Sequence, residues 1–301
     1  MNNRAIAFAL LVVLGAGWGL TQPLSKIAVS EGYRHFGLIF WQMAIASVIL
    51  FAINRARGKS IPLAPRNIGL YAVIALVGTL LPNAASYEAA RHLPAGVLSV
   101  AIATVPIFAF PIALLMGNDT FRWRPFFGVI CGMIGVLLLV GPEASLPDPA
   151  MALFIPLALI APAFYGFEGN YVARFGTQGL DPIQVLLGAS VLGTIVALPL
   201  ALGSGHWIDP RPPWGAADIA LIASSLIHAL VYTSYVWLIG RTGAVFASLV
   251  SYLVTGFGVF WAMLILNEQY SGYFWVAMAM MVAGMALVQP RHSETVAPVD
   301  G

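Results

Sequence analysis

Charged residues and cysteine are both scarce in this sequence. Of its 301 residues only 9% are charged, whereas 60% are hydrophobic. A soluble protein carries roughly 25% charged residues, and no soluble fold of this length hides so large an apolar fraction. The single cysteine, Cys131, excludes a disulfide framework and a cysteine-based zinc site. The composition therefore predicts a membrane protein in which Cys131 is an inert thiol.

Several motifs of catalysis and nucleotide binding are absent as well. The sequence has no GxxxxGK[ST] loop for ATP, no HExxH and no Gly-x-Ser-x-Gly motif. The basic residues are scattered, and none form a patch suited to nucleic acid. We therefore expect no enzymatic activity, no cofactor, no metal site and no nucleic-acid partner.

Long apolar runs make up most of the chain. A helix needs about 20 apolar residues to cross a bilayer, and the first run lacks the cleavage site of a signal peptide. The runs predict an all-α integral membrane fold of ten transmembrane helices, and we expect a disordered cytoplasmic tail at 290–301. The expected helices are 5–27, 36–53, 68–90, 94–116, 125–141, 150–173, 183–202, 216–239, 243–266 and 272–289.

An internal repeat organises these helices. Residues 93–140 recur as residues 242–289, and an offset of 149 residues aligns Ser99 with Ser248 and Asp119 with Glu268. Five helices per repeat is an odd number, so the second half enters the membrane in the opposite orientation. The sequence thus predicts two inverted repeats, 5–141 and 150–289. Many secondary transporters have this design, with the substrate site near the midplane, although a duplication can also record ancestry alone.

The distribution of Lys and Arg predicts the orientation. Positive residues concentrate on the cytoplasmic side of membrane proteins. With both termini in the cytoplasm, ten of the 14 basic residues lie inside and only Lys26, Arg34, Arg91 and Arg211 lie outside. This arrangement would put the acidic hinges Asp119 and Glu268 on opposite sides of the membrane.

Two related segments carry a family resemblance. The first reads GWGLTQPLSK and contains Trp18-Gly19, and the second reads FYGFEGNYVAR and contains Tyr165-Gly166. A basic residue, Lys26 or Arg174, follows each pair. Together with the duplication, these features resemble the drug/metabolite transporter superfamily, specifically EamA-type ten-helix exporters, over residues 5–289.

The resemblance implies a function but not a particular solute. It implies export of amino acids, nucleosides or other small metabolites across a bacterial inner membrane. The sequence departs from the family pattern where the proline of the fourth helix, Pro106, has Thr255 as its counterpart in the second half. We expect this difference to stiffen one gating helix relative to the other, and we take Pro106 and Gly256 as candidate gating residues.

Polar residues recur at helical spacing in four of the expected helices: the first, third, sixth and eighth. Polar groups within membrane helices usually face the bundle interior or a water-filled cavity. They can also be simple interhelical hydrogen-bonding groups. The stripes predict a central cavity whose substrate-binding candidates are Trp18, Gln22, Asn83, Tyr87, Tyr165, Glu168, His228, Tyr232 and Tyr235.

Glu168 and His228 are the ionisable members of this set. Glu168 would exchange a proton for substrate, hold a cationic amine, or pair with Arg174. His228 titrates near neutral pH in its unperturbed form and would act as a switch or as a neutral partner of Tyr232. Glu88 is expected to form a local ion pair with Arg91 and His92 instead.

The leading prediction is a secondary transporter that works by alternating access around this cavity. Its expected partners are a small-molecule substrate, the lipid bilayer and, as one option, protons. The alternative is a membrane protein without transport activity, either a lipid-handling enzyme or a scaffold. Gly128 and Gly132 form a GxxxG pair that would serve either packing within the chain or a homodimer.

Overall fold

The protein is a bundle of helices. The computed structural model describes residues 3–140, 146, 148–242 and 250–288, and all regular structure within these ranges is helical. Seven helical segments are long and apolar enough to cross a membrane, and three apolar helices are shorter. The predicted tail at 290–301 and residues 243–249 of the ninth predicted helix lie outside the described residues.

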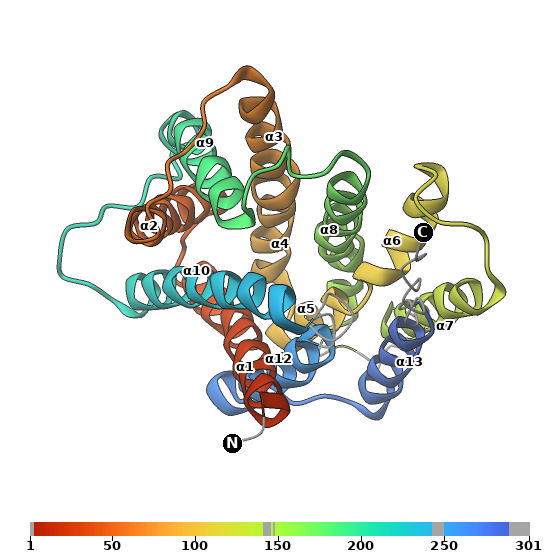
Figure 1. Cartoon of the computed structure of the whole chain (residues 1–301). Helices are drawn as coiled ribbons and strands as arrows, with labels where there is room; N and C mark the ends of the chain where they lie inside the picture. The colour runs from red at the N-terminus through yellow and green to blue at the C-terminus, as the bar shows by residue number, and fades with distance from the viewer. Residues whose placement is uncertain (1–2, 141–145, 147, 243–249, 289–301) are drawn as a thin grey trace, which may run out of the picture.

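Within the described residues, helix occupies most of each of the ten predicted intervals. The first half consists of α1 (Asn3–Ser30), α2 (His35–Ala56), α3 (Pro65–Ala75), η1 (Leu76–Leu80), α4 (Leu81–His92), α5 (Ala95–Ile102), α6 (Val105–Leu115) and α7 (Trp123–Val140). The second half consists of η3 (Pro149–Phe154), α8 (Ile155–Phe175), α9 (Pro182–Gly203), α10 (Ala216–Thr242), α12 (Val250–Leu266) and α13 (Gly272–Val288). Figure 1 labels these elements.

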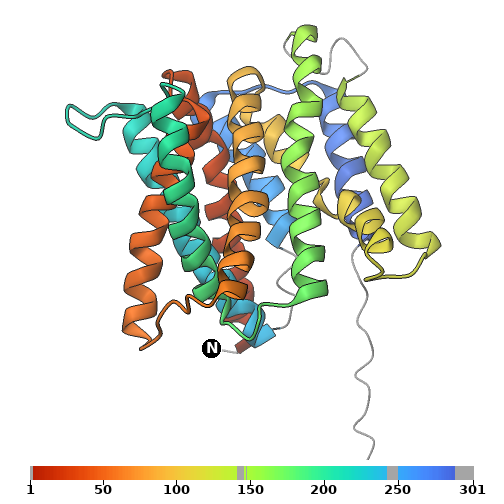
Figure 2. The ribbon, with the colours of Figure 1, turned by 90° about the horizontal axis from the view of Figure 1, so that it is seen from above.

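Figure 2 shows most helices running alongside one another, with their connections gathered at two opposite ends. Loops 57–64, 116–122 and 176–181 lie at the same end as the first turn of α1, and we call it the Asp181 end. Loops 31–34, 204–215 and 267–271 lie at the other, which we call the Glu268 end. Both ends therefore receive loops from both halves of the chain.

Two predicted helices are interrupted, one of them just before a proline. Residues Pro65–His92 run as one segment whose middle, η1, is π-helical. The fourth predicted helix is divided at Ala103 and Thr104 into α5 and α6. Pro106 stands in the first turn of α6, where its missing N–H costs little, whereas inside a continuous helix its ring would strike the carbonyl four residues earlier.

The helix ends follow local sequence signals. Pro182 begins α9, and the carboxylate of Asp181 accepts a hydrogen bond from the backbone N–H of Ile183 at 3.0 Å. The side chain of Gln184 in turn accepts from the N–H of Asp181 at 3.2 Å, which completes a capping box. At the far end of α8, Gly176 adopts a positive φ of 69°, which ends that helix.

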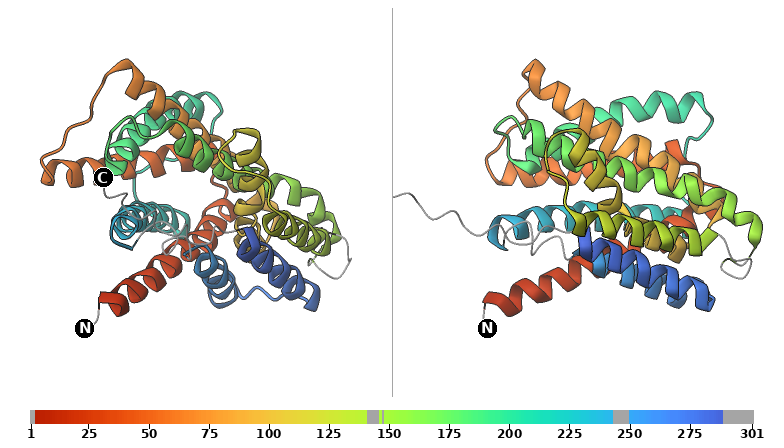
Figure 3. Two further views of the ribbon diagram at one scale, coloured as in Figure 1. Left: turned by 45° about the vertical axis from the view of Figure 1, so that its right-hand side comes forward. Right: turned by 90° about the vertical axis from the view of Figure 1, so that its right-hand side faces the viewer.

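The two halves pack against each other through several helix pairs. Helix α1 contacts α10 and α12, and α8 contacts α4 and α6. The pair α2 and α9 forms one flank of the bundle and the pair α7 and α13 the other, as Figures 1 and 3 show. The largest buried apolar cluster draws on both halves; Ala89, Val100 and Phe274 are fully buried in it.

Glycines allow the closest of these helix crossings. A Cβ added to Gly19 of α1 would lie 2.7 Å from the backbone nitrogen of Gly258 in α12. A Cβ added to Gly166 of α8 would lie 2.9 Å from the backbone nitrogen of Ala109 in α6. Small residues at a crossing let two backbones approach, so the glycines of the two aromatic-Gly pairs have equivalent roles in the two halves.

The GxxxG pair serves packing within the chain. A Cβ on Gly128 of α7 would lie 2.7 Å from the carbonyl oxygen of Gly284 in α13, and one on Gly284 would lie 2.8 Å from the nitrogen of Gly132. Of the two alternatives that the sequence leaves open, the structure shows the intramolecular one, because α13 covers this glycine face.

Candidate functional site

A cavity of about 480 Å³ lies between the two halves, within the range of about 300–1,000 Å³ typical of small-molecule sites. All nine predicted substrate-binding residues line it. They come from α1, α4, α8 and α10, the helices that carry the predicted polar stripes: Trp18, Gln22, Asn83, Tyr87, Tyr165, Glu168, His228, Tyr232 and Tyr235.

A chain of hydrogen bonds connects the two halves across this cavity. The hydroxyl of Tyr165 in α8 donates to Oδ1 of Asn83 in α4 at 3.0 Å. Nδ2 of Asn83 donates to Oε1 of Gln42 in α2 at 2.9 Å, and the hydroxyl of Tyr87 donates to the same oxygen at 2.8 Å. The buried Gln42 therefore fixes the orientation of two lining residues.

Gln42 was not among the candidates from the sequence. It is an isolated polar residue in an apolar helix, so it belongs to no stripe, and its cost of burial in a membrane helix was the only available signal. The cavity also receives apolar or small side chains from α2, α9, α5 and α12, which the stripes do not indicate. These lining residues include Met43, Ala46, Leu98, Ala189, Ser190 and Val254.

Aromatic rings from α1 and α10 gather on one side of the cavity. The ring centroid of Trp18 lies 5.1 Å from that of Tyr235 and 5.8 Å from that of Tyr232, both with edge-to-face geometry. The rings of Trp18 and His228 are 6.3 Å apart. The predicted hydrogen bond between His228 and Tyr232 is not found among the described residues; their rings are 6.1 Å apart and tilted.

Glu168 points toward the backbone of η1. A Cβ added to Gly78 would lie 2.7 Å from the carboxyl carbon of Glu168 and 2.9 Å from its Oε2. A side chain at position 78 would therefore displace the carboxylate from its present place. Within the described part of the chain Glu168 forms no ion pair, so of its three alternatives the pairing with Arg174 is not found.

A second hollow, of about 730 Å³, adjoins the first and continues to the Asp181 end. The two share Ile74, Glu168, Leu186, Tyr232 and Tyr235 as lining residues. The outer part of the second hollow is lined by Arg57, Thr177 and Asp181. The cavity thus extends from the region around Asn83 and Tyr87 toward the Asp181 end.

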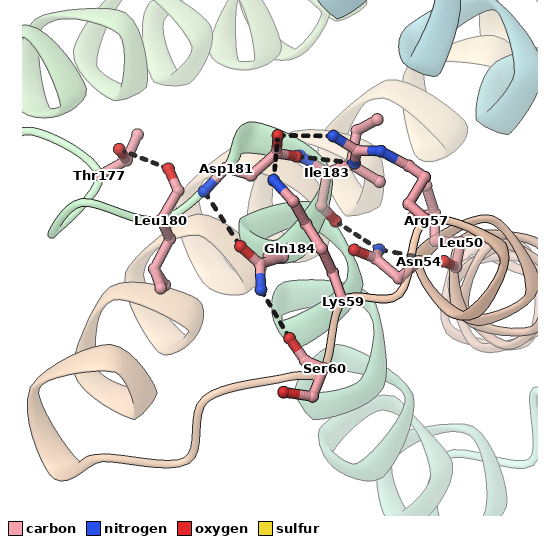
Figure 4. A network of polar contacts seen from close by, with 10 residues as sticks. All are labelled: Leu50, Asn54, Arg57, Lys59, Ser60, Thr177, Leu180, Asp181, Ile183 and Gln184. Atoms are coloured by element: carbon pink, nitrogen blue, oxygen red, sulfur yellow. Dashed lines mark hydrogen bonds and ion pairs between the residues drawn. The ribbon is translucent and has the colours of Figure 1, made fainter.

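An ion-pair network joins the two halves at this end (Figure 4). Nη1 of Arg57 donates to Oδ1 of Asp181 at 2.9 Å and Nη2 to Oδ2 at 2.7 Å, while Nζ of Lys59 donates to Oδ2 at 3.1 Å. Asn54 donates from α2 to the carbonyl of Ile183 at 3.3 Å. The hydrogen bonds from Arg57, with smaller contributions from Lys59 and Ile183, hold the pKa of Asp181 well below its usual range.

The Glu268 end is joined by other contacts. The carboxylate of Glu268 accepts hydrogen bonds from the backbone N–H groups of Ala95 at 2.7 Å and Gly96 at 3.1 Å, and the hydroxyl of Tyr270 also donates to it. An acid at a helix N-terminus satisfies free N–H groups and complements the helix dipole. Burial, and then the bond to Glu268, raises the pKa of Tyr270, which keeps its hydroxyl protonated.

Two further contacts lie at the same end. The hydroxyl of Tyr33 donates to Oδ1 of Asp218 at 2.5 Å, and Nζ of Lys26 donates to the carbonyl of Ala90 at 2.7 Å.

The predicted local ion pair of Glu88 is confirmed: Nη1 of Arg91 lies 2.6 Å from Oε1 of Glu88, and Nε2 of His92 lies 3.6 Å from the same oxygen. Nδ1 of His35 approaches this carboxylate too, at 3.4 Å.

The candidate gating residues do not line the cavity. Pro106 follows the break between α5 and α6, next to the lining residues Ile102 and Val105. Gly256 is exposed on α12, and a Cβ there would meet nothing within 4 Å.

Comparison with known proteins assigns the family. The profile of the EamA-like transporter family matches residues 4–141 and again residues 152–289. The chain belongs to the EamA-like transporter family. The family and the names of its relatives indicate a membrane transporter, not an enzyme, which confirms the drug/metabolite transporter resemblance seen in the aromatic-Gly pairs.

Relatives of this EamA-like transporter come from several bacteria. The "uncharacterized inner membrane transporter YedA" of Escherichia coli (strain K12) is 24% identical over 287 residues, which cover 93% of this chain and 88% of YedA. A "probable terminal-alkyne amino-acid exporter" of Streptantibioticus cattleyicolor is 23% identical over 294 residues, covering 93% and 92%. A solved crystal structure shares the fold with a TM-score of 0.61 at 16% identity, covering 93% of this chain and 96% of its own.

Proposed function

We propose that this EamA-like transporter is a secondary exporter of small metabolites, such as amino acids or related compounds, that works by alternating access. The observation that carries the proposal is the cavity between the halves, where polar and aromatic side chains from α1, α2, α4, α8 and α10 converge. The amino-acid exporter named among the relatives is consistent with this solute range. The site of action is a bacterial inner membrane, as for YedA.

The packing supports an inverted repeat of 5–141 and 150–289. Exchange of the halves turns the contacts of α1 with α10 and α12 into those of α8 with α4 and α6, and both sets occur. It likewise exchanges the contact of α3 with α9 for that of α10 with α2, and both of these occur as well. Pairs related in this way are expected of a pseudo-two-fold axis in the membrane plane, the arrangement of many secondary transporters.

Charge supports a cytoplasmic location of the Asp181 end. Arg57, Lys59, Arg122 and Arg174 lie in or next to its loops, in keeping with the excess of basic residues on the cytoplasmic side of membrane proteins. Because the second hollow continues to this end, we take the structure as the inward-open form. The contacts of Glu268, Tyr33 and Lys26 then close the outward side.

Glu168 is the proposed coupling group. A carboxylate without an ion-pair partner in a membrane cavity can be neutralised either by a proton or by a cationic solute. If Glu168 binds either a proton or the solute but never both, inward movement of protons drives outward movement of solute. No water-soluble cofactor or ATP enters this scheme.

Reconstituted vesicles test the proposal. We expect the protein to release a preloaded solute faster than empty liposomes do, and we expect an inwardly directed proton gradient to accelerate release. Glu168→Gln should lose the response to the gradient, whereas Glu31→Gln, a matched change at an exposed position of the Glu268 end, should keep it. A wild-type protein that moves no amino acid, amine or nucleoside would contradict the proposal and favour the non-transporting alternative.

The cavity gives little support to the lipid-handling alternative. Among the described residues, no group of three or more His, Cys, Asp and Glu side chains is placed to hold a metal ion. A scaffold would tolerate replacement of the lining residues, so Asn83→Leu separates the two alternatives: a scaffold keeps its function, whereas the proposed exporter loses solute movement.

A further inference from the structure

The charges of the cavity wall are strongly unequal. Glu168 is the one carboxylate among the described residues that line the first cavity, and no Lys or Arg among them lines it. The adjoining hollow adds Arg57 and Asp181, but these two pair with each other. A solute in the described part of the cavity therefore meets one negative group and no positive group free to bind it.

The position of Glu168 leaves it accessible to a solute. Its carboxylate lies against Gly78 within the π-helical turn η1, and both residues line the cavity. Single π-helical turns inside α-helices occur frequently at functional sites. Because Gly78 has no side chain, the carboxylate of Glu168 lies directly against the backbone of η1. It has no cationic partner among the described residues.

The aromatic residues complement this charge. Trp18, Tyr232 and Tyr235 stand together on the wall, with Trp18 in contact with both tyrosines. Aromatic faces attract organic cations, most strongly when water is excluded. Tyr232 and Tyr235 also line the hollow shared with Glu168. A cation bound at Glu168 therefore has aromatic surface nearby for its apolar part.

A free carboxylate on the solute would find no Lys or Arg to pair with among the described lining residues. A buried charge without a partner is costly, and a solute carboxylate would also be repelled by Glu168. The neutral donors of the lining, such as the amide of Asn83, can offer a solute carboxylate hydrogen bonds but no compensating positive charge.

We infer that the cavity selects solutes that carry one protonated amine and no free carboxylate, with the amine on Glu168 and an apolar or aromatic body among Trp18, Tyr232 and Tyr235. This inference rests on the proposed transport function and narrows its solute class from amino acids to amines derived from or related to them. Gly78 acts as a positioning residue, since it sets where the carboxylate lies.

Three probes that share a phenylethyl group attached to nitrogen test the selectivity: phenethylamine, phenylalanine and N-acetylphenethylamine. They present an amine alone, an amine with a carboxylate, and no charge. Binding to the purified protein is measured by calorimetry and by thermal shift, and transport by counterflow in vesicles. We expect phenethylamine to bind at least about tenfold more tightly than either of the others, the difference that one charge-assisted hydrogen bond supplies.

Variants at Glu168 and Gly78 test whether these two residues cause the selectivity. Glu168→Gln should reduce the preference for phenethylamine over N-acetylphenethylamine to about onefold, because the charge is lost and the shape is kept. Gly78→Ala, which displaces the carboxylate, should lower the same ratio by a smaller factor. Glu31→Gln should leave it unchanged. The ratio of the two affinities does not change when part of the protein is unfolded. The unfolding temperature of each variant without ligand is measured as well.

The outcomes separate this inference from the function on which it rests. Transport of phenylalanine equal to or better than that of phenethylamine would overturn the inference and leave the exporter standing. A Glu168→Gln variant that keeps the preference for the amine would likewise overturn the inference alone. No counterflow of any probe, amino acid or nucleoside by the wild-type protein would overturn both.

Discussion

The fourth helix of one half is broken at residues 103 and 104, whereas the equivalent described positions of the other half, 252 and 253, are helical. In the first half, α5 and α6 are separated at Ala103 and Thr104, and Pro106 follows. At the offset of 149 residues the corresponding positions are Tyr252, Leu253 and Thr255, which lie inside the continuous helix α12. Thr255 keeps its backbone N–H, and its hydroxyl donates to the carbonyl of Ser251 at 3.1 Å.

The acidic hinges that follow these helices also differ. Asp119 pairs with its near neighbour Arg122 at 2.7 Å and stays within its own half. Glu268, at the equivalent repeat position, crosses to the N-terminus of α5 in the other half. The loop after α12 therefore contacts the N-terminus of α5 in the other half. The break at Ala103 and Thr104 follows the C-terminus of the same helix, α5. From this difference we expect bending to be concentrated in the first half and α12 to move as a rigid element.

Substitution of a proline into α12 should have the largest effect on stability. Thr255→Pro removes a backbone donor in the interior of α12, where Thr255 is fully buried, and should destabilise the protein by about 3 kcal/mol or more. The reciprocal change, Pro106→Thr, should cost less than about 1 kcal/mol, since helix-start prolines contribute little beyond preorganisation. Unfolding temperatures in detergent give the comparison, and equal losses would refute the assigned asymmetry.

The next largest difference is expected between substitutions of the two hinge acids, Glu268 and Asp119. Glu268→Ala removes an acceptor of two backbone N–H groups and of the Tyr270 hydroxyl, and we expect a loss of about 2 kcal/mol. Asp119→Ala breaks a half-exposed local pair and should cost less than about 0.5 kcal/mol. Thermal unfolding of the two variants side by side measures the difference. Similar shifts for both would mean that the cross-half contact contributes no more than the local one.

The Asp181 end should respond to pH. The pKa of Asp181 is lower in the folded chain because Arg57 and Lys59 donate to its carboxylate. Its stabilisation is therefore fully present above its unfolded pKa of about 4 and is lost as the pH falls from there toward the lowered folded value.

Because this pair is partly exposed, the contribution should not exceed about 1 kcal/mol. Asp181→Asn should flatten the decline of the unfolding temperature between roughly pH 5 and pH 3, and salt should weaken the effect in the wild type. Glu31→Gln serves as the control. An unchanged pH profile in Asp181→Asn would show that other carboxylates dominate the acid response.

Gly256→Ala should change stability only slightly, and it is the most direct test of whether α12 bends at this position. Gly256 is exposed in α12, and an added Cβ meets nothing within 4 Å. Alanine in place of a helical glycine stabilises by about 0.5–1 kcal/mol. If α12 moves as a rigid element, the counterflow rate should stay within about twofold of the wild type, whereas a large drop would restore Gly256 as a hinge.

Helical periodicity predicts most of the fold and much of the candidate site. The polar stripes place Trp18 and Gln22, or His228, Tyr232 and Tyr235, on one face of a helix, and that face can be read without knowing its neighbours. All of the stripe residues chosen in this way line the cavity.

Features that depend on a second helix could not be read in the same way. Gln42 acquires its place only through Asn83 and Tyr87. The π-helical turn has no periodic signature, and its significance comes from the contact of Gly78 with Glu168. Glu268 reads as a hinge acid in sequence because its partner N–H groups lie more than 170 residues away. The asymmetry at Pro106 and Thr255 was predicted, but the position of the break was not.

The hydrogen bond from Tyr165 to Asn83 has a kinetic consequence. It joins α8 of one half to α4 of the other inside the cavity itself, so any movement that parts these helices has to break it. An empty carrier breaks it without replacement, whereas a solute that offers its own donor or acceptor to Asn83 takes over the lost partner. On the proposed alternating-access mechanism, we therefore expect the loaded protein to reorient faster than the empty one, and exchange of solute for solute to be faster than net efflux. Tyr165→Phe would narrow that gap by speeding the return of the empty carrier.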